Sequence, residues 1–105
     1  MARSREEARK FRELYNHKEP ETGAAMNIVA TYFFNEILNQ EFVTEDDVRW
    51  CYNVVKKELG VNLEQSLRDS KRDQYLNGKK TPLGRGYSIT ACGINYFNSI
   101  KKDGK

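Results

Sequence analysis

The chain has 105 residues, of which 38% are hydrophobic and 31% are charged. This length and composition fit one small globular domain. No apolar run approaches the ~20 residues that a membrane-spanning helix needs. The N-terminus leads into charged residues instead of an apolar signal segment, so we expect a cytoplasmic protein.

The candidates for metal binding and catalysis are few. Cys51 and Cys92 are the only cysteines, and His17 is the only histidine. Their spacing matches no zinc motif, so we expect two reduced structural thiols, no metal and no other cofactor. No nucleophile–base pair is visible either, and we therefore expect that the chain is not an enzyme.

The net charge of +3 is unevenly distributed along the chain. Residues 21–60 hold three Lys/Arg against seven Asp/Glu, which gives −4. Residues 61–105 hold nine against four, which gives +5. A positive last third favours a basic face toward a polyanion, although surface lysines and arginines are also common on proteins without such a partner.

Residues 1–18 are predicted to hold an amphipathic helix. Ser4 and Glu7 form a capping box, and the helix should run to about residue 16. Phe11, Leu14 and Tyr15 fall on one face, which needs a partner surface in this domain's own core or in a second subunit. We expect this face to help form a homodimer. A short linker at residues 17–23 should follow.

Two further helices are predicted at residues 24–40 and 44–59, with a short extended segment at Phe42 and Val43 between them. The first should be the most buried helix of the domain. The second is capped by Thr44, and three acids in its first turn match the helix dipole. Trp50 and Val54 lie on its flank, where they are expected to pack under the N-terminal helix.

Gly60 is expected to end the second helix, and Asn62 to cap a third helix at residues 63–73. Helix, tight glycine turn and helix make a helix-turn-helix unit. Leu63 and Leu67 should face inward. The opposite, polar face then carries Gln65, Arg68 and Arg72, with Lys71 at its margin.

A hairpin is expected next, with residues 74–77 pairing with residues 87–90. Between them, residues 78–86 contain three glycines and a proline, which predicts a long basic loop. Thr90 should cap a last helix that runs to about residue 101 and turns Cys92, Tyr96 and Ile100 inward. Gly93 inside it suggests close packing against a neighbouring element, and residues 102–105 are expected to be a polar tail.

The segment from Tyr87 to Gly93 reads YSITACG and resembles the Tyr-x-Leu-Thr-x-x-Gly pattern of winged helix-turn-helix domains. Together with the preceding helices, the resemblance covers roughly residues 24–101. It implies a mainly α fold with a small β-hairpin, a winged helix-turn-helix at residues 22–101 with an extra N-terminal helix.

Members of this superfamily mostly bind DNA, so the resemblance implies a DNA-binding domain, for which a small transcriptional regulator is the leading role. Its partner would be double-stranded DNA. The alternative is a protein–protein interaction module in a larger assembly, which Asp69 and Asp73 on the third helix favour. In the DNA-binding interpretation the third helix reads bases and the wing contacts phosphates. The expected contact residues are Gln65, Arg68, Lys71, Arg72, Lys79, Lys80 and Arg85.

Overall fold

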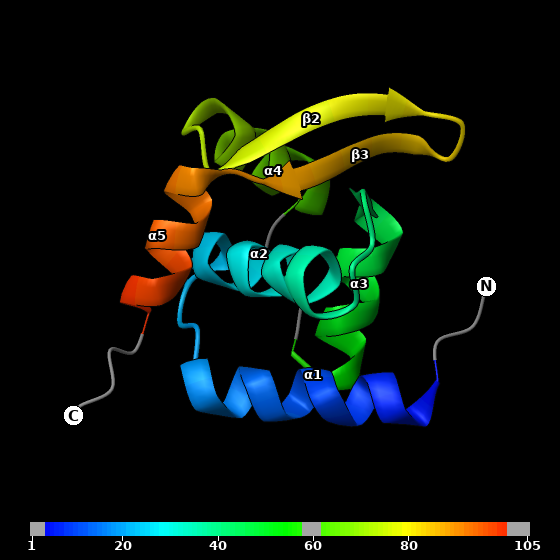
Figure 1. Cartoon of the computed structure of the whole chain (residues 1–105), viewed down its shortest axis with the longest axis vertical. Coiled ribbons are helices and arrows are strands. Elements are labelled where there is room, and N and C mark those ends of the chain that lie inside the picture. Colours follow the sequence, from blue (N-terminus) through cyan, green and yellow to red (C-terminus); the bar gives the residue numbers. More distant parts are fainter. Residues whose placement is uncertain (1–3, 58–61, 101–105) are drawn as a thin grey trace.

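The computed structural model describes residues 4–57 and 62–100, which form a mainly α-helical domain with a small antiparallel sheet. Figure 1 shows α2 in the middle of the molecule, with the β2–β3 hairpin along one side and α1 along the opposite side. The elements in chain order are α1 (Arg5–Lys18), α2 (Gly23–Tyr32), the π-helical turn η1 (Phe33–Ile37), β1 (Val43–Thr44), α3 (Glu45–Val54), α4 (Leu63–Arg72), β2 (Leu76–Thr81), β3 (Gly84–Ile89) and α5 (Ala91–Ser99).

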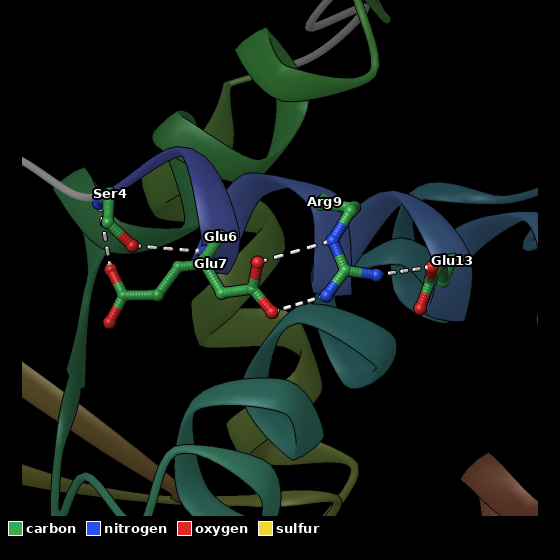
Figure 2. A network of polar contacts seen from close by, with 5 residues as sticks. All are labelled: Ser4, Glu6, Glu7, Arg9 and Glu13. Carbon is green, nitrogen blue, oxygen red and sulfur yellow. Dashed lines mark hydrogen bonds and ion pairs between the residues drawn. The ribbon is translucent and has the colours of Figure 1, made fainter.

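Helix α1 begins at the predicted capping box. The Glu7 N–H donates to Ser4 Oγ and the Ser4 N–H donates to Glu7 Oε1, both at 3.1 Å (Figure 2). Arg9 then bridges Glu6 and Glu13 along the exposed face, and its hydrogen bond lowers the pKa of Glu6. The helix continues two residues past its predicted end and closes only at Glu19, whose φ of 50° is left-handed. The predicted linker is shorter because residues 17 and 18 are helical.

The apolar face of α1 packs on the chain's own core. Phe11 is fully buried, and its ring centroid lies 5.3 Å from that of Phe33 and 6.4 Å from that of Trp50. Leu14 and Tyr15 are partly buried against the same cluster. The sequence left open whether this face packs on the chain's own core or on a second subunit. The chain's own core covers Phe11, the central residue of the face. The expected place of Trp50 beneath α1 is confirmed.

Lys18 is a buried lysine at the C-terminal end of α1, and its side chain contacts the C-terminal end of α5. Its Nζ donates to the carbonyl oxygens of Phe97 (3.0 Å) and Ile100 (3.3 Å), and lies 4.3 Å from the centroid of the Phe97 ring. The last carbonyls of a helix lack intrahelical donors and carry the negative end of its dipole. Lys18 therefore caps the C-terminal end of α5 from α1.

Replacing Lys18 with Met should lower the free energy of unfolding by about 1–3 kcal/mol, because two carbonyls lose a charged donor. Met keeps the length of the side chain, so lost packing contributes little. Urea denaturation followed by circular dichroism measures the change. Lys10→Met, at an exposed position of the same helix, is the matched control. Equal midpoints for the two variants would show that the Lys18 cap contributes nothing.

The expected helix at residues 24–40 changes character before its end. Regular α-helix stops at Tyr32, and η1 follows. In this wider turn, Asn35 Nδ2 donates to the carbonyl oxygen of Gln40 (2.8 Å), while Asn35 Oδ1 accepts from the backbone N–H of Ile89 (2.7 Å). The side chain of Asn35 thus ties the helix end to strand β3, a long-range contact that helical periodicity does not reveal.

The sheet has the order β1-β3-β2, so the short first strand pairs with the last strand. The predicted extended segment before α3 is confirmed at Val43. The expected loop at residues 78–86 is wrong, because β2 and β3 run through it and leave only Pro82 and Leu83 at the tip. Gly86 fits within a strand because Phe42 packs against it; a Cβ at Gly86 would lie 2.9 Å from Phe42 Cβ.

Helix α3 begins at the predicted Thr44 cap but ends at Val54, five residues before the expected end at residue 59. Lys56 takes a left-handed conformation with φ 56°. The N–H groups of Lys56 and Lys57 then donate to the carbonyl oxygens of Asn53 (3.1 Å) and Tyr52 (2.9 Å). These two bonds make a Schellman motif, which satisfies the last carbonyls without a glycine. The predicted role of Gly60 lies outside the described residues.

Helix α5 starts at the predicted Thr90 cap. Ile100 is buried and Tyr96 is partly buried, as expected, but the prediction for Cys92 is wrong, because Cys92 is exposed while Gly93 and Phe97 are buried. The ring of Phe97 stacks on Tyr32 of α2 with centroids 3.7 Å apart. That stacking fixes the rotation of the helix and turns Cys92 outward. The helix ends at Ser99, two residues before the expected end at about residue 101, because the backbone of Ile100 is extended. The expected tail at residues 102–105 lies outside the described residues.

Candidate nucleic-acid interface

Helix α4 presents a polar face because its few apolar side chains all point inward. Asn62 caps its first turn, with Oδ1 accepting from the Gln65 N–H at 3.2 Å. Leu63, Leu67 and Ser70 are buried. The remaining face exposes all four residues that the sequence predicted for it: Gln65, Arg68, Lys71 and Arg72.

Three of these four side chains are engaged by acids of the same helix. Arg68 pairs with Glu64 at 2.7 Å, and Arg72 pairs with Asp69 at 3.2 Å. Gln65 Nε2 also donates to Asp69 Oδ1, at 2.9 Å. Exposed pairs of this kind contribute only about 0–1 kcal/mol each. A polyanion can therefore replace the acids at little cost.

Lys71 and Arg85 approach each other where α4 meets the hairpin. A Cβ at Gly78 would lie 2.9 Å from Cδ and Cε of Lys71 and 3.7 Å from Arg85 Nη1. Both cations therefore cross the same glycine of β2. Because Gly78 has no side chain, the side chains of Lys71 and Arg85 can occupy the space beside it. Two like charges held together repel, and a bound anion would relieve that repulsion.

These cations line a groove of 810 Å³ between α4, the base of the hairpin and the start of α5. Its basic lining residues are Arg68, Lys71, Arg72 and Arg85; among the described residues, no carboxylate lines it. Ala91 and Cys92, the first residues of α5, border the same groove. A helix N-terminus carries partial positive charge, so it adds to the attraction for an anion. Sequence reasoning missed this end of α5 as part of the site.

The hairpin places its lysines on opposite faces. Lys80 pairs across the strands with Arg85, whereas Lys79 pairs with Gly86. Successive side chains of a strand alternate between faces. Lys80 and Arg85 thus share the face that meets α4, while Lys79 Nζ lies on the other face, 5.3 Å from the centroid of the Phe42 ring. Of the seven predicted residues, four line the groove: Arg68, Lys71, Arg72 and Arg85. Gln65 is exposed on α4 outside its lining, Lys80 shares the hairpin face of Arg85, and Lys79 lies on the opposite face.

Tyr87 is buried on the same face of the hairpin as Arg85. Burial raises its pKa above the ordinary tyrosine value, and the charges of Arg85 and Arg68 act in the opposite direction. The phenol is therefore neutral at physiological pH. It therefore adds no negative charge near Arg68 and Arg85.

Neither cysteine is in a disulfide: Cys51 is buried and Cys92 is exposed. Within residues 4–57 and 62–100, no three His, Cys, Asp or Glu side chains form a group that could hold a metal ion. We expect a chelator to leave the melting temperature unchanged. Removing a metal lowers the melting temperature only of a fold that is stabilised by the free energy of metal binding. Thermal melting with and without EDTA measures this, and a large drop with EDTA would contradict it.

Over the described parts of the chain, no helix is both long enough and apolar enough to cross a bilayer. Comparisons of the sequence with protein-family models and with curated proteins, and of the structure with solved structures, found no match.

Proposed function

We propose that the chain is a DNA-binding domain of the winged helix-turn-helix kind, acting as a small transcriptional regulator. The order helix, strand, helix, helix and hairpin from α2 to β3 supports this interpretation, as does the pairing of β1 with β3. In such a domain α3 and α4 are the helix-turn-helix pair and the β2–β3 hairpin is the wing. Helix α4 would be the element that enters the major groove.

The observation that carries the proposal is the basic groove beside α4. Its four cations come from two elements that are separate in sequence, and no carboxylate of the described residues lines the groove, although Glu64, Asp69 and Asp73 pair with its arginines from outside. A DNA backbone offers a row of phosphates to such a groove, and most protein–DNA hydrogen bonds go to the backbone. Lys71 and Arg85 line the groove and Lys80 pairs with Arg85 across the hairpin, so these three cations are suited to phosphates.

Base reading would then fall to Gln65, Arg68 and Arg72. Their long side chains stand opposite the buried Leu63 and Leu67, and planar donors such as arginine can form paired hydrogen bonds with guanine. Each must first leave an exposed partner on its own helix, at small cost. Lys79 faces away and should contribute little.

The phosphate contacts are tested with the double variant Lys71→Ala/Arg85→Ala. It should weaken binding to all duplexes alike and lower the slope of log K against log salt by about two, one for each lost contact. Fluorescence anisotropy with random duplexes at several salt concentrations measures both quantities. The control is Lys10→Ala/Arg12→Ala, which removes the same charge from exposed positions on α1, on the opposite side of the molecule from the hairpin (Figure 1).

Equal effects of the two double variants would mean that binding follows net charge alone, and the proposed interface would be wrong. Absence of binding by the intact chain at low salt would overturn the DNA-binding proposal itself. The protein–protein interaction module is then the second candidate. Glu64, Asp69 and Asp73, which neutralise the arginines of α4, favour it.

Base reading needs its own measurement. Replacing Arg68 or Gln65 with Ala should cost about 1–3 kcal/mol on a selected duplex if a paired base contact is lost. The same variants should cost less on random duplexes. A cost that is equal on both would show that these side chains contact only the backbone.

A further inference from the structure

A second groove, of 1090 Å³, lies between the tip of the hairpin and the first turns of α1 and α3. Figure 1 shows these three parts on the same side of the molecule. Its apolar lining comes from Phe42, Trp50, Pro82 and Leu83. The first two are half-buried, and the last two form the tip between β2 and β3. The chemistry of this groove differs from that of the basic groove beside α4.

The hairpin tip holds Leu83 in the solvent. The leucine is 86% exposed, although it is a large apolar side chain. Thr81 fixes the turn, because its Oγ1 donates to the Gly84 carbonyl oxygen (2.6 Å) and accepts from the Leu83 N–H (3.2 Å). Pro82 further restricts the backbone. Leu83 therefore stands in a fixed place above the groove and contributes nothing to the chain's own core.

The rim of this groove is acidic. Glu7, Asp46 and Asp47 line it, and among the described residues no lysine or arginine does. Asp47 Oδ2 is fixed by Gln40 Nε2 (2.8 Å) and by the Thr44 N–H (3.0 Å), whereas Asp46 is exposed. The neighbouring Lys79 already rests its ammonium over the Phe42 ring. The aromatic floor therefore accepts a cation within the chain itself.

We propose that this groove binds a short segment of another protein that carries lysine or arginine beside one large apolar side chain. The apolar side chain would lie between Trp50, Phe42 and Leu83, and the cations would meet the carboxylates of Glu7, Asp46 and Asp47. DNA is a poor occupant, because its phosphates would be repelled by the acidic rim. The inference is independent of DNA binding, since it uses none of the residues of α4.

A display library of short random peptides, selected against the immobilised full chain, tests the chemistry without assuming a partner. Enriched peptides should combine Lys or Arg with a large apolar residue. A fluorescein-labelled enriched peptide should then bind about tenfold more weakly to Leu83→Ser/Asp46→Asn than to the unchanged chain. The affinity should also fall as salt rises, because the charges at the rim are exposed.

The matched control is Ile37→Ser/Glu36→Gln, which removes an apolar side chain with 41% exposure and a neighbouring acid elsewhere on the surface. It should leave peptide affinity unchanged. No enrichment, acidic enriched peptides, or equal affinities for the two double variants would overturn the proposal. Self-association that Leu83→Ser abolishes would also overturn it, since the occupant would then be a second copy of the chain. Finally, the proposal would fail if Leu83→Ser/Asp46→Asn lost duplex binding and no peptide bound, because the hairpin tip would then contact DNA.

Discussion

Replacing Phe11 with Ala is expected to lower the free energy of unfolding by about 3–5 kcal/mol. The ring is fully buried and meets both Phe33 of η1 and Trp50 of α3. Phe34 touches the same cluster from the other side, with its ring centroid 6.0 Å from that of Trp50. Removing Phe11 would leave a cavity at the junction of three elements, which cannot collapse without moving α1. Urea denaturation followed by tryptophan fluorescence measures the loss.

The control is Arg12→Ala, at the exposed neighbouring position on the same helix. Surface substitutions of this kind usually change stability by less than about 0.5 kcal/mol. Similar midpoints for the two variants would mean that α1 is a detachable arm. A small domain has a total stability of about 5–15 kcal/mol, so the expected loss at Phe11 is a large share of it.

The same reasoning bears on the predicted homodimer through Phe11, Leu14 and Tyr15. Phe11 is already covered within its own chain, so only the partly buried Leu14 and Tyr15 remain for a second subunit. A chain that lacks residues 1–18 should be less stable even if it stays monomeric. Sedimentation of both chains separates the two effects. A dimer of the intact chain that becomes a monomer on truncation would support the predicted interface.

Helix starts could be predicted from the sequence because their signals are local. Ser4, Thr44, Asn62 and Thr90 each accept from a backbone N–H three residues later, as their side chains and spacing indicated. Helix ends were less predictable. Glu19, Lys56 and Gln74 take left-handed conformations after α1, α3 and α4, although none of them is a glycine. Contacts with the rest of the fold favour these left-handed turns, and the amino-acid sequence alone does not reveal those contacts.

In the candidate interface, too, local features could be predicted from the sequence, whereas features set by tertiary contacts could not. The polar face of α4 followed from the spacing of Leu63 and Leu67, because a helix has a fixed period. The faces of the hairpin did not follow, since a strand's register depends on where its turn lies. Reading glycines as breakers made the predicted loop at residues 78–86 too long, although the turn at Pro82 and Leu83 does lie within it. Only the pairing of Lys80 with Arg85 shows which lysine faces α4.

Replacing Gly93 with Ala should destabilise the fold by about 2–3 kcal/mol, through overpacking. A Cβ at this position would lie 2.3 Å from the carbonyl oxygen of Tyr75 and 2.6 Å from Ile89 Cγ1. The Tyr75 carbonyl cannot move freely, because it accepts from the Thr90 N–H at 3.1 Å. The Tyr75 N–H in turn donates to the Ser70 carbonyl oxygen at the end of α4. Relief of the clash would therefore disturb the junction of α4, β2 and α5.

Helix propensity acts in the opposite direction, since Ala is better than Gly inside a helix by about 1 kcal/mol. Asn95→Ala, at an exposed position of α5, gains helix propensity without a clash, by less than the Gly-to-Ala difference, and should stabilise the chain slightly. A Gly93→Ala variant as stable as Asn95→Ala would show that α5 can move away from Tyr75 at no cost. The clash has a second consequence, because Thr90, Ala91 and Cys92 line the basic groove. Gly93→Ala at a temperature where it remains folded should therefore also weaken duplex binding, whereas Asn95→Ala should not.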